Sequence, residues 1–344
     1  MSLIGFVKSR EGRHFFASEF TKPRIKILGE LKAPPLTTHY SLVGTAFDYL
    51  IRFCLKYRYP NAKDNHWVAD FGNDTILRIK SPRSPMAIFH KKRIENVKFA
   101  KETYSQFLKN GVLTEDIFKS SILLAQIDPV RRALAFDKQI GLVDNNDIQD
   151  LKNLINLVNF ENFKPASYCL LNPTFNEGSK LVGGGDTDIV IDNQIIDIKT
   201  TRKLEVTRDM FNQIIGYYIL GEIGGIGKEK INISNINEIG FYFSRYGIKF
   251  MYKVEDIIDF NFLSNFIEKF KKCFENEPIE IGKRILEIER LSCEKQIPWN
   301  KGLEGVQVPW NKGLKGVQVP WNKGLEGVQV PWNKGLKRVH RSKL

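Results

Sequence analysis

The sequence predicts an α/β fold: a mixed central sheet flanked by helices, with a helical N-terminal elaboration and an extended repeat tail. Two observations lead to this prediction. From residue 1 to about 285, segments with helical spacing of apolar residues alternate with short β-branched runs. After Cys293 the composition changes, and one eleven-residue unit recurs four times. We therefore expect a domain over 1–285, a linker over 286–295 and a repeat segment over 296–344.

Five segments are expected to be helical because their apolar residues recur at helical spacing. They are 41–57, 87–110, 114–126, 146–158 and 260–274. Pro60 ends the first of these, since proline lacks an amide hydrogen and clashes with the preceding turn. Two apolar runs, 239–243 and 248–254, flank the turn 245–247 and predict a β-hairpin.

The net charge is +13 over 344 residues, with an isoelectric point near 9.4. The hydrophobic content of 42% is ordinary for a globular protein, so the charge is the unusual feature. A basic bias of this size favours a polyanionic partner, with nucleic acid first and an anionic membrane surface second.

Cysteine usage and the N-terminus bear on the compartment. The four cysteines are scattered, which excludes a CxxC zinc site and argues against a secreted disulfide framework. The N-terminus lacks the apolar run of a signal peptide, and no stretch of about 20 apolar residues follows. We therefore expect an intracellular, cytoplasmic protein that is neither secreted nor embedded in a membrane.

The segment 183–218 carries the pattern most suggestive of chemistry. Two β-branched runs, 188–191 and 194–199, flank Asp192 and Asn193. Both turn residues tolerate positive φ, which suits a tight two-residue hairpin turn. We expect a hairpin in which the residue before the turn pairs with the residue after it.

In that register Asp188 faces Asp197, and Asp186 faces Lys199. Side chains alternate between the faces of a strand, so these four groups share one face. The opposite face is apolar and consists of Ile189, Ile191, Ile196 and Ile198. Facing carboxylates repel unless a cation lies between them, and Mg²⁺ or Mn²⁺ is the natural occupant. Lys199 would orient a water molecule or offset charge developing on a phosphorane.

Asp188 and the DxK triplet that begins at Asp197 resemble the D…(D/E)xK signature of the PD-(D/E)xK nuclease superfamily. Gln213 and Tyr217 lie four residues apart on an expected helix and resemble the QxxxY motif of its RecB-type branch. This resemblance covers about residues 40–275 and implies a restriction-endonuclease-like core with magnesium-dependent phosphodiester hydrolysis. The catalytic residues it implies are Asp188, Asp197, Lys199, Gln213 and Tyr217.

Gly44 and Asp48 resemble the upstream GxxxH helix of the same branch, with aspartate where histidine is usual. Aspartate is a ligand for Mg²⁺, and the glycine one turn earlier leaves room for close approach of another backbone or a metal. The expected metal ligands are Asp188, Asp197, Asp186 and Asp48. We favour Asp188 over Asp186, because it begins the apolar strand and faces Asp197 across the hairpin.

The tail repeats the motif PWNKGL, which begins at Pro298, Pro309, Pro320 and Pro331. The segment 295–344 has ten Lys/Arg against two Glu, a net of +8. The motif resembles the nuclease-associated modular (NUMOD) repeats found beside homing endonuclease domains, which implies contact with double-stranded DNA. Each unit offers tryptophan for stacking, asparagine for a groove edge and lysine for a phosphate. The expected DNA-binding residues are Trp299, Asn300, Lys301, Trp310, Asn311, Lys312, Trp321, Asn322, Lys323, Trp332, Asn333 and Lys334.

The leading hypothesis is a metal-dependent DNA endonuclease, with a mobile or homing element as one source, whose tail grips DNA. The second is a RecB-like nuclease that processes or repairs DNA ends. The third is a catalytically silent DNA-binding protein built on a nuclease fold. RNA or anionic lipid is a weaker alternative partner for the tail. The histidines show no metal-binding spacing.

Overall fold

The computed structural model describes residues 2–65, 67–70, 85–133 and 140–275. The chain divides into two units, Met1–Glu289 and Arg290–Leu344, and all described residues belong to the first. The predicted linker and the four predicted repeats lie outside the described residues.

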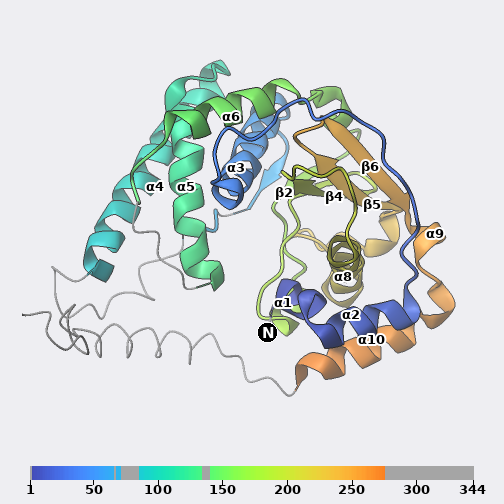
Figure 1. Ribbon diagram of the computed structural model, residues 1–344. Helices are drawn as coiled ribbons and strands as arrows, with labels where there is room; N and C mark the ends of the chain where they lie inside the picture. Colours follow the sequence, from blue (N-terminus) through green and yellow to red (C-terminus); the bar gives the residue numbers. More distant parts are fainter. Residues whose placement is uncertain (1, 66, 71–84, 134–139, 276–344) are drawn as a thin grey trace, which may run out of the picture. The chain divides into compact units, whose positions relative to one another are not determined.

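A six-stranded mixed sheet forms the centre of the described part (Figure 1). Its strands are β1 (Lys63–Asp64), β2 (Cys169–Leu171), β3 (Ile189–Ile191), β4 (Gln194–Lys199), β5 (Glu238–Phe243) and β6 (Ile248–Lys253). They lie side by side in chain order. Neighbours β1 and β2, and also β4 and β5, are parallel, whereas the other neighbours are antiparallel. The prediction of a mixed sheet flanked by helices is confirmed.

The β3–β4 hairpin has the predicted register. Ile191 pairs with Gln194, and Ile189 pairs with Ile196. Asp192 adopts the left-handed conformation that the tight turn requires, with φ of 49°. Its carboxylate also accepts hydrogen bonds from three backbone N–H groups, those of Ala166, Ser167 and Tyr168. The turn is therefore anchored to the segment that leads into β2.

One face of the sheet shares an apolar cluster with four helices. They are α3 (Tyr40–Arg58), α4 (Pro85–Asn110), α5 (Glu115–Ala133) and α6 (Asn145–Asn156). Of these, α3 lies nearest the strands, and α4 and α5 lie beyond it (Figure 1). Ile189, Ile191 and Ile196 pack against them in one apolar cluster, as the alternation along the hairpin predicts. The helix α5 continues through Pro129 to Ala133, beyond its predicted end at residue 126.

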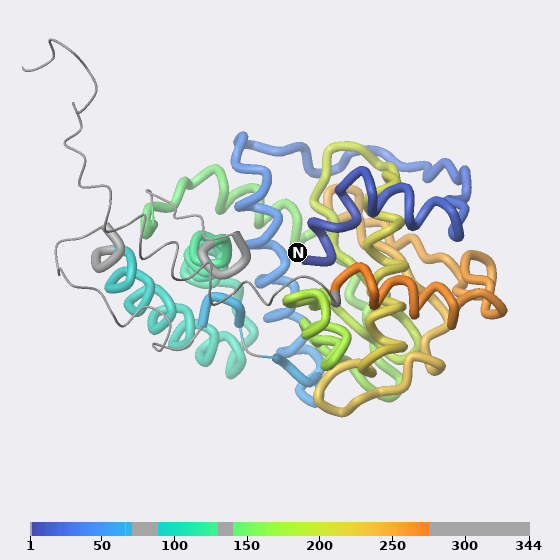
Figure 2. Tube along the Cα trace, turned by 90° about the horizontal axis from the view of Figure 1, so that it is seen from below, coloured from blue at the N-terminus to red at the C-terminus, as the bar shows by residue number. Residues whose placement is uncertain are grey.

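The second face is also buried, because Val190 and Ile195 point into a separate apolar cluster. The helices of this cluster are α1 (Leu3–Lys8), α2 (Arg10–Glu19), α8 (Arg208–Gly224) and α10 (Phe260–Glu275). Phenylalanine rings join them, with Phe16 near Phe266 and Phe270. Figure 2 shows α10 beside α1 and α2, although they come from opposite ends of the described chain. The hairpin face that we expected to be polar is thus apolar at mid-strand and polar only at one end.

Shorter elements complete the domain. They are α7 (Glu177–Leu181), α9 (Val254–Ile257), and the 3₁₀ turns η2 (Phe160–Phe163) and η3 (Ile233–Asn235). The hairpin predicted around 245–247 is β5–β6, and the predicted final helix is α10. Among the described helices, none has both the length and the apolar character needed to span a bilayer.

Candidate active site

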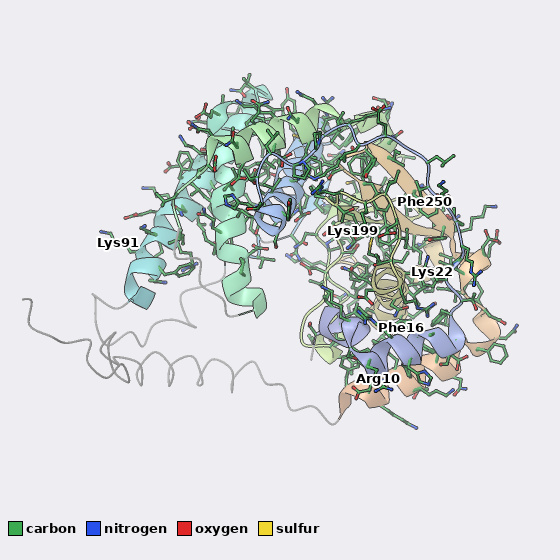
Figure 3. The ribbon with its side chains drawn as sticks, viewed as in Figure 1. Arg10, Phe16, Lys22, Lys91, Lys199 and Phe250 are labelled. Atoms are coloured by element: carbon green, nitrogen blue, oxygen red, sulfur yellow. The ribbon has the colours of Figure 1, made fainter. Side chains whose placement is uncertain are left out.

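The residues suited to catalysis lie at one end of the sheet. Asp197 and Lys199 lie within the last three residues of β4, and Asp188 immediately precedes β3. The parallel strand β5 ends beside them, where Ser244 donates its N–H to the Lys199 carbonyl and its hydroxyl to Thr200. These bonds fix the backbone from which the Lys199 side chain extends, and Figure 3 labels that side chain next to α8.

Helix α8 supplies the second half of the site. It begins at a Thr207 cap, whose hydroxyl accepts the Met210 N–H, and Asp209 lies favourably in its first turn. Gln213 and Tyr217 are one turn apart and face β4, because both side chains contact Asp197. The capped helix start therefore sets the position at which the glutamine meets the strand.

Gln213 joins Asp197 and Lys199. Its Oε1 accepts a hydrogen bond from Lys199 Nζ at 3.0 Å, and its Nε2 donates to Asp197 Oδ1 at 3.1 Å. The same Nε2 lies 2.6 Å from the Tyr217 hydroxyl, which lies 3.5 Å from Asp197 Oδ1. The amide can satisfy an ammonium and a carboxylate at once only in this orientation. The structure thus brings together all four residues of the predicted DxK and QxxxY motifs.

Asp197 retains one oxygen without a hydrogen-bond donor. Its side chain is buried, and Oδ2 lies 2.6 Å from Lys199 Nζ as an ion pair. That contact is an ion pair whose geometry is not that of a good hydrogen bond, and no other donor contacts Oδ2 in the described part of the chain. The oxygen therefore keeps a lone pair for a further positive ligand.

Asp188 lies close enough to Asp197 for their charges to interact. Its Oδ2 accepts the backbone N–H of Ile198 at 2.6 Å. Burial raises the pKa of Asp188 well above its usual range, and the negative charges of Asp48 and Asp197 raise it further. Burial also raises the pKa of Asp197, against the lowering effect of Lys199. Both carboxylates are therefore costly to ionise unless another cation joins them.

Asp48 from α3 reaches the same region but is already paired. Arg52 Nη2 lies 2.6 Å from Asp48 Oδ2, and Arg52 Nε lies 3.2 Å from Oδ1. Arg52 is almost fully buried, with its guanidinium 4.6 Å from the centre of the Tyr49 ring. As placed, Asp48 is a partner of Arg52 and influences Asp188 and Asp197 through its charge.

Gly44 lies beside the end of β4, as expected for a close approach. A methyl group built on it would lie 3.7 Å from Thr200 Cβ, which is ordinary contact. There is therefore space beside Gly44, as expected, and an alanine side chain would also fit there.

The predicted pairing of Asp186 with Lys199 is wrong. The paired residues of β3 and β4 stop at Ile189 and Ile196, and Asp186 is bridged to Thr174 instead. The cause is local, since Asn172 donates to the Asp188 carbonyl and Thr187 donates to the Pro173 carbonyl. These bonds turn the chain before β3 toward β2. Asp186 still contributes negative charge near Tyr217.

The donor set fits a hard divalent cation only in part. Within the described ranges, no group of three or more His, Cys, Asp or Glu side chains is arranged to hold a metal ion. Of the four expected ligands, Asp188 and Asp197 remain, with the unsatisfied Oδ2 of Asp197 between protein charges. Two carboxylates with water or backbone carbonyls are sufficient ligands for Mg²⁺, which keeps several waters in most protein sites.

Sequence reasoning missed Arg52 and Asp64. Arg52 is the i+4 neighbour of Asp48, so helical spacing contained the signal. Asp64 ends the two-residue strand β1, and its charge interacts with Arg52 and Asp48. Asp48, Asp64, Asp188 and Asp197 therefore interact through their charges with Arg52 and Lys199.

Searches among protein-family models, curated proteins and solved structures found no match to this chain.

Proposed function

We propose that this protein is a magnesium- or manganese-dependent deoxyribonuclease with a restriction-endonuclease-like core of the PD-(D/E)xK type. The observation that carries the proposal is the convergence of Asp188, Asp197, Lys199 and Gln213 at one end of the sheet. Two crowded carboxylates beside a fixed ammonium are an arrangement suited to a cation and a phosphodiester together. The +13 net charge favours a polyanionic substrate.

Asp188 and Asp197 are the residues that would hold the metal. When bound, Mg²⁺ would polarise the scissile phosphate and lower the pKa of a coordinated water. Lys199 presents an ammonium whose direction is fixed by Asp197 and Gln213. Its role is to stabilise negative charge on the phosphorane and to orient the attacking water.

Gln213 and Tyr217 act as positioning residues. Gln213 holds the lysine and the carboxylate in one register, and Tyr217 supports the Gln213 amide from the buried side. Because Gln213 is uncharged, it keeps the Lys199 ammonium close to Asp197 and leaves the charge of Asp188 unneutralised. Loss of Gln213 would therefore weaken catalysis by misplacing Lys199.

A cleavage assay on two DNA forms tests this proposal. Supercoiled circular DNA and linear duplex are incubated with the full chain in Mg²⁺, Mn²⁺ or EDTA. We expect metal-dependent cleavage, and Asp197→Asn should reduce it at least about 100-fold. Cutting of circles indicates an endonuclease, whereas digestion of linear DNA alone indicates a nuclease acting on ends.

The matched control is Asp256→Asn, the same chemical change on an exposed residue of α9. It should cleave like the wild type. Metal-independent cleavage, or undiminished cleavage by a folded Asp197→Asn variant, contradicts the proposed site.

A catalytically silent DNA-binding protein is the second candidate. The observation that favours it is the pairing of Asp48 with Arg52, which leaves two of the expected carboxylates for a metal. DNA binding with no cleavage in any of the three conditions would select this candidate.

A further inference from the structure

The segment 20–33 crosses the domain without forming a helix or a strand, and we call it the strap. It contains Lys22, Arg24, Lys26 and Lys32 against a single acidic residue, Glu30. Arg24, Lys26 and Lys32 are exposed. The strap follows α2 and precedes α3, so it belongs to the N-terminal part for which the sequence suggested no role.

The strap is held in place by its backbone and its apolar side chains. Ile27 and Leu31 pack against the apolar cluster around α8. Gly29 runs so close to Ile248 and Leu204 that an added methyl group would lie 2.4 Å and 3.0 Å from their side chains. The strap is therefore fixed against the start of β6 and the loop 200–206.

The basic side chains of the strap have no acidic partners. Within the described part of the chain, Lys22, Arg24, Lys26 and Lys32 form no ion pair and no side-chain hydrogen bond, and neither does Arg202 of the adjoining loop. Several basic residues elsewhere in the domain do have an acidic partner, as Lys101 has in Asp70. Unpaired cations in a row on a fixed backbone raise the local positive electrostatic potential, which attracts anionic ligands.

The strap leads to the candidate active site. Its residues Lys32 and Ala33 donate their N–H groups to the Arg245 carbonyl. The preceding residue, Ser244, donates to the carbonyl of Lys199. The loop 200–206 leaves the site directly after Lys199 and adds Arg202 and Lys203. Figure 3 labels Lys22 at the start of the strap and Lys199 in the site.

The chemistry of the strap selects its ligand. From Arg24 to Lys32 an extended chain spans at most about 26–29 Å, the axial length of about eight base pairs at 3.4 Å each. Ile25 and Leu28 are 52% and 75% exposed between the cations. Alternating basic and apolar groups suit a sugar–phosphate backbone.

We propose that the strap, together with Arg202 and Lys203, binds the phosphodiester backbone of the DNA substrate and leads it to Lys199. This inference rests on the proposed nuclease function for the identity of the ligand. The strap contributes affinity that does not depend on DNA sequence, because its contacts are with phosphates.

Salt-dependent binding of the full chain to a 30-base-pair duplex of about 10 nm length, measured in EDTA, tests the proposal. The variant Arg24→Gln/Lys26→Gln/Lys32→Gln should lower the slope of log K against log salt by about 2–3, at roughly 0.9 for each lost phosphate contact. The matched control is Lys91→Gln/Lys98→Gln/Lys109→Gln on α4, which removes the same charge from exposed positions.

Because EDTA prevents metal-dependent cleavage, this outcome is separate from that of the nuclease assay. An unchanged slope in the strap variant overturns the inference. An equal decrease in the α4 variant also overturns it, since the effect would then follow net charge alone. Failure of the wild type to cut DNA, with a strap-specific change in slope, would reject the nuclease and retain the strap as a DNA-binding surface.

Discussion

Two buried ion pairs flank the end of β5, and they are built differently. Arg245 and Asp150 are both about 1% exposed, and two guanidinium nitrogens meet the two carboxylate oxygens at 2.8 Å and 3.0 Å. Lys199 and Asp197 approach to 2.6 Å but leave Asp197 Oδ2 without a hydrogen-bond donor. The Arg245 pair satisfies both carboxylate oxygens of Asp150, whereas the Lys199 pair leaves one oxygen of Asp197 without a hydrogen bond.

The Arg245–Asp150 pair is suited to a structural role, whereas the Lys199–Asp197 pair is suited to chemistry. Arginine forms a planar fork that saturates a carboxylate, while a lysine ammonium meets it at one point. The lysine pair also lies beside Asp188, so its surroundings have excess negative charge. A divalent cation would therefore stabilise the fold if it bound beside the Lys199–Asp197 pair.

Removal of Arg245 should have the largest effect on stability. In Arg245→Met the Asp150 carboxylate stays buried without its partner, which costs about 3–5 kcal/mol. The free energy of unfolding from urea titration measures the loss. The double variant Arg245→Met/Asp150→Leu should recover much of it, since an apolar pair replaces the ionic one. If Arg245→Met lost less than about 1 kcal/mol, Asp150 would not depend on Arg245 as its buried ion-pair partner.

Magnesium should stabilise the wild type through the Lys199 pair. At a concentration about 100 times its dissociation constant, a ligand specific to the folded state adds about 2.7 kcal/mol. Asp188→Asn and Asp197→Asn should lose this increment, and Asp188→Asn should be at least as stable as the wild type in EDTA because a crowded buried charge is gone. Thermal melting with and without Mg²⁺ provides the measurement. Equal shifts in wild type and variants would place the ion elsewhere.

The turn residue Asp192 should give a smaller, pH-dependent effect. Partial burial acts against it, but three N–H donors lower the pKa of Asp192. A depressed pKa in the folded state stabilises the fold above the unfolded pKa of about 3.9, and this stability is lost as the pH falls through the folded value. Asp192→Asn keeps the positive φ and should cost about 1–2 kcal/mol at pH 7.

That cost should begin to shrink below about pH 4, where the unfolded chain binds a proton at this carboxyl, and it should disappear as the pH falls through the lower pKa of the folded state. Urea titrations of both proteins at pH 7 and pH 3 provide the comparison. A difference that stays constant with pH would mean that the carboxylate charge has no part in anchoring the turn.

The sequence predicts best where local chemistry decides the structure. The β3–β4 register follows from a turn that accepts positive φ and from apolar alternation, and both are local properties. The pairing of Gln213 with Tyr217 follows from helical spacing. Register brings Asp188 to Asp197, and helical spacing brings Gln213 to Tyr217. The contact between the two pairs is tertiary, and only the family resemblance implied it.

Prediction fails where distant segments decide. Strands β1 and β2 are two and three residues long, too short to show a period. The bridge of Asp186 to Thr174 depends on how β2 meets β3, and the strap depends on a carbonyl more than 200 residues away. The function of Asp48 changes once Arg52 is seen to occupy both of its oxygens.

Arg245 also bears on the order in which the molecule assembles. Its guanidinium joins Ala33 and Asp150, which are 212 and 95 positions away in the sequence. Contacts of such separation form late, because long stretches of chain must first be ordered. During synthesis the N-terminal strap leaves the ribosome early, but it packs into its final position only after β5 has emerged. The seating of the strap is therefore one of the last folding steps of this domain.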